Sequence, residues 1–380
     1  MLAHDADLEL FRDNFRRFLL ENIEPHYAGW EKTGIMPREV FNQLGENGYL
    51  CVDMPEEYGG YGVPTNYSLM LVEEAARAGY GSLSTAISVH SEIAAPYILH
   101  IGSEAQKQYW LPKMVSGEVV GAIGMTEPGA GSDLQSMRSS AILNGDHYLL
   151  NGSKTFISNG QHADLVIVAA KTDPTARAKG ISLLLVDTHL PGFNKGTNLE
   201  KIGMHSQDTS ELFFDNVKVP ADQLLGTAGS GFAYLMQELP RERMGIAVTA
   251  LGAILGAIDI TVKYVNDRQA FGQAIGKFQN TRFVLAQAKI DALATEALVR
   301  QSTEKYMKGE LDIPTAAAVK AFTTDNQCRI ADDLLQLFGG YGYMTEYPIS
   351  RFYVDARIQR IYGGTNEIMK EVVARDMLGR

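Results

Sequence analysis

The feature that most constrains this chain is a change in the spacing of its apolar residues, which occurs twice along the sequence. Up to about residue 114 the apolar residues recur at helical spacing, as in the run at residues 7–20. Beyond Leu134, short segments separated by Gly, Pro and Asn predict strands. From Phe232 to the end the helical spacing returns. The chain is therefore predicted to fold as helices, then a β region, then helices.

The strand-patterned middle is not interrupted by any helical pattern of ten residues. We therefore expect an antiparallel sheet, as a barrel or sandwich, rather than a doubly wound sheet. The turn Asn144-Gly145-Asp146 predicts a hairpin within it. The predicted fold class is a multi-domain α+β protein. It has an N-terminal helical domain at 1–122, a β domain at 123–228 and a C-terminal helical bundle of four-helix type at 229–380.

Composition narrows the class of function. The formal net charge of −11 over 380 residues argues against a nucleic-acid-binding surface. The two cysteines, Cys51 and Cys328, are too far apart to suggest a disulfide framework or a zinc site. Residues 1–5 lack the basic and apolar segments of a targeting signal, so we expect a cytoplasmic enzyme or a processed mitochondrial one. The uncharged stretch at 244–258 is shorter than the roughly 20 residues that span a bilayer, so it predicts a buried helix and no membrane span.

The junction between the first two regions, residues 125–134, has the sequence MTEPGAGSDL. Gly129 and Gly131 permit close approaches that other residues do not. Thr126, Ser132 and the exposed amides then form a polar shelf, which suits a flat heteroaromatic ring or a pyrophosphate. The alternative is an ordinary interdomain turn. The dinucleotide fingerprint, the P-loop and the GxSxG elbow are all absent from the sequence.

Five segments, taken in order, resemble the motifs of the acyl-CoA dehydrogenase family. They are TEPGAGSD at 126–133, KTFISNG at 154–160, DRQAFG at 267–272, QLFGGYG at 336–342 and IYGGTNE at 361–367. The resemblance covers essentially the whole chain, and it is closest to the long-chain branch of the family.

The resemblance implies an FAD enzyme that introduces a trans double bond between the α and β carbons of an acyl-CoA. In such enzymes a carboxylate removes the α proton while the β hydrogen leaves as hydride to flavin N5. The site must therefore stabilise enolate-like charge on the thioester oxygen. The resemblance also implies a homotetramer, built as a dimer of dimers, that passes electrons to an electron-transferring flavoprotein.

By position, the resemblance assigns two groups of residues to FAD. In the first, Phe156 flanks the ring and Ser158 donates to flavin N5; the alternative for Ser158 is a solvated strand end. In the second, Arg268 resembles a pyrophosphate clamp that reaches the FAD of a neighbouring subunit; the alternative is an ordinary solvated helix residue. The predicted cofactor residues are Ile123, Met125, Thr126, Gly131, Ser132, Phe156, Ile157, Ser158, Arg268, Phe271, Gln279, Gln336, Leu337, Phe338, Gly339, Gly340, Thr365, Asn366 and Glu367.

The catalytic base is where this chain departs from most of the family. Most members carry a Glu directly after the Tyr of the final motif, whereas this chain has Gly363. Residues 237–243 instead resemble a helix start in the long-chain branch, where a Glu immediately before Arg is the base; the isovaleryl branch also uses this helix. We therefore predict Glu242 as the base, with a pKa raised by closure over an apolar acyl chain. The alternative is that a Glu in a first helical turn only complements the helix dipole.

The predicted substrate-binding residues are Ser132, Pro240, Arg241, Arg243, Gly363 and Gly364. Arg243 is expected to partner Glu242 electrostatically, and Gly363 to offer its N–H to the thioester oxygen. Ser84 and Ser88 stand where the medium-chain branch carries longer polar residues, which favours a deeper pocket and a long acyl chain. Two alternatives stay open: a branched-chain or terpenoid acyl-CoA as substrate, or a flavin- or acyl-CoA-binding protein without dehydrogenase activity.

Overall fold

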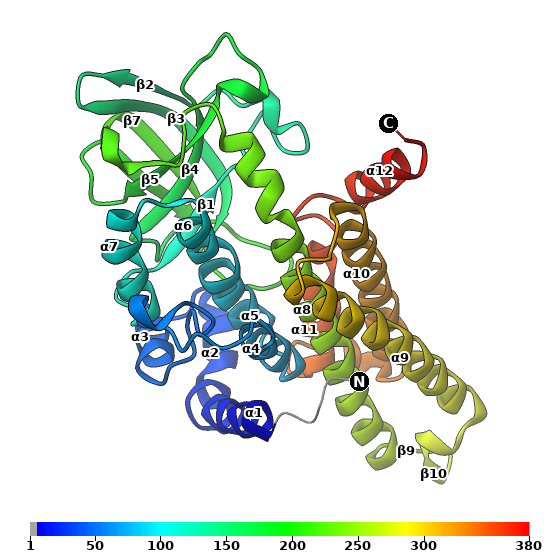
Figure 1. The fold of residues 1–380 in the computed structure, drawn as a ribbon. Coiled ribbons are helices and arrows are strands. Elements are labelled where there is room, and N and C mark those ends of the chain that lie inside the picture. Colours follow the sequence, from blue (N-terminus) through cyan, green and yellow to red (C-terminus); the bar gives the residue numbers. More distant parts are fainter. Residues whose placement is uncertain (1–5, 380) are drawn as a thin grey trace.

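The computed structural model describes residues 6–379, and residues 1–5, where we expect no targeting signal, lie outside the described part of the chain. Helices, a β region and helices follow one another, so the predicted fold class is confirmed (Figure 1). Most of the N-terminal helices pack around one apolar core that includes Phe15, Tyr27 and Leu83, whereas the last two share a core with strands of the β region. These helices are α1 (Ala6–Phe18), α2 (Glu24–Thr33), α3 (Glu39–Glu46), α4 (Asn66–Arg77), α5 (Gly81–Ile87), α6 (Ala95–Ile101) and α7 (Glu104–Val115), with π-helical turns η1 (Leu19–Ile23) and η3 (Ser88–Ala94).

The β region is one eight-stranded sheet with the order β6-β7-β3-β2-β4-β5-β8, and β1 pairs with β4. Most neighbours are antiparallel, as expected, but β1 and β2 each pair with β4 in parallel. The middle strands β4 and β5 are almost continuously apolar because both of their faces are buried. The strands are β1 (Gly121–Gly124), β2 (Ser140–Asn144), β3 (His147–Ser158), β4 (Leu165–Lys171), β5 (Ile181–Asp187), β6 (Phe193–Asn198), β7 (Thr209–Pro220) and β8 (Leu224–Leu225).

The C-terminal helices form a bundle around the long helix α8, which runs from the β region into the bundle (Figure 1). Two of the helices begin with side-chain caps, since Asp312 accepts from Thr315 N and Thr365 accepts from Ile368 N. The helices are α8 (Gly231–Asp267), α9 (Gln279–Met307), α10 (Ile313–Gln336), α11 (Pro348–Gln359) and α12 (Asn366–Met377), and the short strands β9 (Gln269–Ala270) and β10 (Gln273–Ala274) connect α8 to α9.

Helix α8 packs very closely against α4. A Cβ atom built on Gly252 would lie 2.3 Å from the backbone oxygen of Glu73, and one on Gly256 would lie 2.0 Å from that of Arg77. Among residues 6–379, α8 is the one helix long and apolar enough to cross a membrane, yet most of it is buried inside the fold. The predicted burial of residues 244–258 is therefore confirmed, and it places the middle of α8 at the junction of the regions.

We expect Gly256→Ala to destabilise the protein, because the added methyl group meets backbone rather than a movable side chain. The expected loss is about 1–3 kcal/mol of the free energy of unfolding, measured by urea denaturation. Gly29→Ala is the matched control, since Gly29 lies within α2 with nothing within 4 Å of the added atom. It should be neutral or stabilising by up to about 1 kcal/mol. Equal unfolding midpoints for the Gly256 variant and the wild type would contradict this packing.

Candidate active site

A carboxylate is buried well inside α8. Glu242 is 3% exposed, and Tyr97 Oη donates a hydrogen bond to Glu242 Oε1 at 2.8 Å. Burial raises the pKa of Glu242 to about 7, while the Tyr97 hydrogen bond and the charge of Arg243 oppose the rise. A carboxyl group that titrates near neutral pH and whose ionised form is oriented by a hydrogen bond is suited to act as a general base.

The structure excludes the alternative that Glu242 only complements the dipole at the start of a helix. Helix α8 begins at Gly231, so Glu242 lies about 16 Å from its start, whereas the dipole acts mainly within the first turn. The helix start that the resemblance implied at residues 237–243 was wrong, because α8 already begins at Gly231. Pro240 therefore lies in the helix interior.

Gly363 faces the same side of α8 as Glu242. A Cβ atom on Gly363 would lie 2.3 Å from Cδ1 of Ile246, and Ile246 follows Glu242 by one helical turn. Gly363 also has a φ of +62°, which favours glycine. Ile246 therefore fills the space that a side chain at position 363 would enter, and Glu242 lies one helical turn before it on α8.

Two cationic side chains, Arg243 and Lys320, lie near the loop that contains Gly363 and Gly364. Arg243 is buried, and within the described residues its Nε and Nη1 atoms have no hydrogen-bond partner. Lys320 of α10 donates to the carbonyl of Gly364 at 2.8 Å and to Asn366 Oδ1 at 2.9 Å. Burial, followed by the charge of Arg243, lowers the pKa of Lys320 to about 8. Lys320 thus fixes the loop, while Arg243 keeps donors available for a ligand beside Glu242.

Two predicted contacts are not supported by the side-chain geometry. Arg241, expected at the substrate, points elsewhere and forms buried ion pairs with Asp53 (2.7 Å) and Glu92 (3.1 Å). Asn366, expected at the cofactor, is 1% exposed, and its amide donates to three groups on α10. Both side chains use their polar atoms to hold the fold, since unpaired polar groups are costly to bury.

The shelf at residues 125–134 is held from beneath by a buried ion pair. Lys154 Nζ of β3 lies 2.8 Å from Glu127 Oε1 and donates to the carbonyl of Met125 at 3.2 Å. Thr155 N donates to the carbonyl of Thr126 at 2.9 Å, which joins the shelf to β3. Met125 also packs against the apolar cluster that contains Tyr97. The shelf and Tyr97, which donates a hydrogen bond to Glu242, are therefore held by the same apolar cluster.

The predicted flavin-facing residues of β3 differ in orientation. Phe156 is 68% exposed with a φ of +58°, at an irregularity in the pairing of β3 with β7. Such a bulge turns a side chain outward and is common beside functional sites. Ile157 points into the apolar core of the sheet, whereas Ser158 is half-buried. The structure therefore offers Phe156 and Ser158 to a ligand, but not the side chain of Ile157.

The remaining residues of the first group lie around the same shelf. Ile123 is partly buried in β1, at the start of the junction, and Gly131 and Ser132 are exposed. Nothing lies within 4 Å of a Cβ atom on Gly129 or Gly131, so this part of the shelf is open. In the final motif, the Thr365 hydroxyl caps α12 and Glu367 is exposed in its first turn.

The second predicted cofactor group gathers at the opposite end of α8. Arg268, the C-cap residue of α8, lies roughly 40 Å along the helix from Glu242. There a groove of about 470 Å³ brings Arg268 together with the predicted residues Gln336, Leu337, Phe338, Gly339 and Gly340. Phe271 is 95% exposed, and Gln279, also exposed, begins α9. Phe338 differs from the others in that its ring stacks on Tyr264 and is buried.

These residues fit the expected FAD. The shelf presents a hydroxyl, backbone groups and an exposed aromatic ring, which suit an isoalloxazine. The distant groove presents an arginine and the open backbone of Gly339 and Gly340, which suit a pyrophosphate or adenosine. The residues that fit FAD therefore lie in two places, roughly 40 Å apart along α8.

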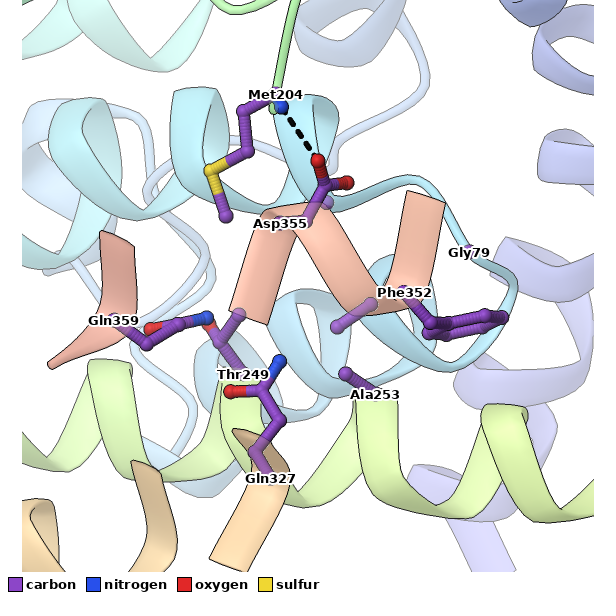
Figure 2. A pocket seen from close by; sticks show the side chains of 10 residues that line it. Gly79, Met204, Thr249, Ala253, Gln327, Phe352, Asp355 and Gln359 are labelled. Atoms are coloured by element: carbon purple, nitrogen blue, oxygen red, sulfur yellow. Dashed lines mark hydrogen bonds between the residues drawn. The ribbon is translucent and has the colours of Figure 1, made fainter. Parts of the chain in front are cut away.

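Farther along α8 lies a small buried cavity of about 10 Å³. Figure 2 shows Thr249 of α8, Gln327 of α10 and Gln359 of α11 converging on it. Gln359 Oε1 accepts from Tyr362, the neighbour of Gly363. Burial raises the pKa of Asp355, which also lines the cavity, to about 7. A cavity of this size has room for about one water molecule.

Sequence reasoning missed two residues of the site, Tyr97 and Lys320. Tyr97 looks like an ordinary apolar helix residue, and its partner Glu242 is distant in the chain. Lys320 lies in the middle of α10 and is completely buried, where a lysine is unusual. Only the packing of α6 and α10 against the site reveals these contacts.

Three family models match consecutive parts of the chain. They describe the acyl-CoA dehydrogenase N-terminal domain at residues 5–118, the middle domain at 122–217 and the C-terminal domain at 229–378.

Individual proteins match over nearly the whole chain. The mitochondrial long-chain specific acyl-CoA dehydrogenase of Sus scrofa is 45% identical over 98% of this chain and 87% of its own length. The crystal structure of an acyl-CoA dehydrogenase from Geobacillus kaustophilus superposes with a TM-score of 0.96 at 45% identity and covers 99% of both chains. A structure described as the electron transferring flavoprotein of Acidaminococcus fermentans has a TM-score of 0.97 at 36% identity and covers 100% of both chains.

The raised pKa of Glu242 predicts a pH-dependent stability. Unfolded, this carboxyl ionises near pH 4.5; folded, it holds its proton to about pH 7, so it lowers stability as pH rises between these values. Glu242→Gln should therefore be more stable than the wild type at pH 8, by on the order of 3 kcal/mol, with the gap closing toward pH 5. Tyr97→Phe should move the pKa further up, because it removes the hydrogen bond to the ionised form. Thermal unfolding midpoints across this pH range test both, and a gap independent of pH would refute the assignment.

Proposed function

Because the chain belongs to the acyl-CoA dehydrogenase family, whose members are FAD-dependent enzymes acting on the CH–CH bond of acyl-CoA, we propose that it oxidises a long-chain acyl-CoA to the trans-2-enoyl-CoA. The observation that carries this proposal is the placement of Glu242. It is a buried carboxyl with a pKa of about 7, hydrogen-bonded to Tyr97 and facing the side of α8 that meets Gly363.

Glu242 acts as the base in this proposal. In its ionised form it removes the proton from the α carbon, and the Tyr97 hydroxyl orients the carboxylate and stabilises its charge. FAD, when bound, accepts the hydride that leaves the β carbon. Tight packing around Glu242 excludes water, which strengthens each electrostatic interaction in the site.

Two further groups would stabilise charge on the thioester oxygen as the proton leaves. The backbone N–H of Gly363 is one, since its loop is fixed by the contact between Lys320 and Gly364. The guanidinium of Arg243 is the other, because it is buried with unpaired donors next to Glu242. Preorganised donors of this kind are effective because they do not need to rearrange during the reaction.

The acyl chain is proposed to run along the face of α8 that continues from Glu242. Ser88 Oγ lies 3.1 Å from a Cβ atom built on Gly245, and Ser84 Oγ lies 3.3 Å from Thr249 Oγ1. Both serines therefore border the same face of α8, and their small size leaves room that longer side chains would fill. The similarity to the long-chain enzyme of Sus scrofa supports the same choice of substrate.

The division of the cofactor residues supports an oligomer. We propose that Arg268 and its groove complete the FAD site of a neighbouring subunit, within a homotetramer built as a dimer of dimers. We also propose electron-transferring flavoprotein as the electron acceptor, which the similarity to the Acidaminococcus fermentans structure supports. A location in the cytoplasm, or in the mitochondrial matrix, belongs to the same proposal, and the Sus scrofa relative is a mitochondrial protein.

Glu242→Gln should abolish the reduction of FAD by substrate, because glutamine cannot accept the α proton. The expected fall in the rate of anaerobic flavin bleaching by palmitoyl-CoA is about 10²–10⁴-fold. Glu296→Gln on the exposed side of α9 is the control and should bleach normally. A panel of shorter, branched and terpenoid thioesters establishes the substrate. Undiminished bleaching in Glu242→Gln would exclude the base, and a wild type that binds FAD but is bleached by none of the thioesters would favour a non-dehydrogenating protein.

Two inactive variants should restore activity to each other when their subunits are mixed. Arg268→Gln should weaken FAD binding by about ten- to a hundredfold through loss of charge-assisted hydrogen bonds. If Arg268 contributes to the FAD site of the neighbouring subunit, a mixed pair of the two variants has one intact site. That site takes Glu242 from the Arg268→Gln subunit and Arg268 from the Glu242→Gln subunit. In a 1:1 co-refolded mixture about half of the subunit pairs are mixed and each mixed pair has one intact site of two, so up to about a quarter of the wild-type activity should return. No recovery, with mixed oligomers verified by mass, would place both residues in the same site.

A further inference from the structure

The burial of Glu242 creates a requirement that this residue cannot meet alone. If Glu242 is the base proposed above, each turnover leaves one proton on its carboxyl group. The side chain is 3% exposed and its near neighbour Tyr97 is completely buried, so this proton has no direct contact with solvent. The enzyme therefore needs a route by which the proton leaves before the next turnover.

A second carboxylate lies one turn earlier on the same face of α8. Glu238 is 4% exposed, and residues four apart on a helix have Cβ atoms about 5–6 Å apart. Glu238 also contributes to the raised pKa values of both Glu242 and Tyr97, which places it close to this pair. Its carboxylate oxygens each lie 3.0 Å from Nδ1 of His100.

The pair Glu238–His100 has a side chain exposed to solvent, whereas both side chains of the pair Glu242–Tyr97 are buried. His100 and Tyr97 both lie on α6, three residues apart, so the two pairs connect the same two helices side by side. The His100 side chain is 36% exposed. An imidazole accepts a proton on one nitrogen and releases one from the other, so a half-exposed histidine can pass a proton between a buried carboxylate and water.

We propose that Glu238 and His100 form the proton exit of the buried base. The Cα–H bond breaks, its electron pair becomes part of the new C=C bond, and its proton goes to Glu242. The hydride from the β carbon goes to FAD, which is the oxidant. The proton then moves from Glu242 to the Glu238 carboxylate one helical turn away, next to His100 and finally to solvent water.

Other groups face Glu238, but they are less suited to this role. They are Tyr97 of α6, Gln237 and Glu242 of α8, and Tyr306 of α9. Among the groups named, His100 alone is both basic and open to solvent. The alternative is that the contact between Glu238 and His100 only links α6 to α8. The experiment below distinguishes this structural role from proton transfer.

The test measures proton escape without net oxidation. A 3-thia-acyl-CoA has sulfur at the β position, so it cannot lose a hydride there, but its α proton can still move to the base. With the FAD-loaded enzyme in D₂O, the rate at which deuterium enters the α position reports exchange of the base with solvent. Glu238→Gln and His100→Gln should each lower this rate by about tenfold or more, while the first-turnover bleaching by palmitoyl-CoA changes by less than about twofold.

Two further measurements make the outcome decisive. His100→Ala should regain exchange when imidazole is added, which a purely structural link would not show. His147→Gln is the matched control, because His147 forms a similar pair with Asp146 (2.9 Å) in the exposed β2–β3 turn and should leave exchange unchanged. Wild-type exchange in both exit variants, or equal losses of exchange and bleaching, would overturn the proposal. Absence of exchange in the wild type would instead count against Glu242 as the base.

Discussion

The close packing of α8 against the N-terminal helices is the constraint on which the rest of the structure depends. Gly252 and Gly256 allow the backbones of α8 and α4 to approach as no larger residue would. The consequence is that polar side chains on the preceding turns of α8 are enclosed as well. Two of them have partners inside the protein, because Arg241 pairs with Asp53 and Glu92 and Glu242 accepts a hydrogen bond from Tyr97. A carboxyl that titrates near neutral pH is a product of this packing.

The regions of the protein contribute different physical elements to the site. The N-terminal helices supply Tyr97, the β region supplies the shelf held by Lys154 and Glu127, and the bundle supplies the loop that Lys320 fixes. Each of these supports is buried, so the groups they hold are oriented before any ligand arrives. Such preorganisation is what allows backbone amides and short hydroxyls to act on a flat cofactor and a thioester.

The order of the elements and the position of the main motifs could be read from the sequence, because helical and strand periodicity are local properties. Glu242 and the clustering of Arg268 with Gln336–Gly340 followed from resemblance. Other features depend on contacts between distant parts of the chain. Two examples have no local signature in the sequence. They are the parallel pairing of β1 with β4 and the hydrogen bonds that Asn366 of α12 donates to α10. The true start of α8 at Gly231, before the segment 237–243 that resembles a helix start, likewise depends on the packing of the whole helix.

The contact between Ile246 and Gly363 has a consequence for how such enzymes diverge. Glu242 on α8 and position 363 on the loop border one shared space, which the side chain of Ile246 fills. Introducing an acid at 363 would bring a steric clash and, with Glu242 retained, a second negative charge in a dry cleft. The two arrangements are thus mutually exclusive, and a lineage that exchanges one for the other must replace residues on both the helix and the loop.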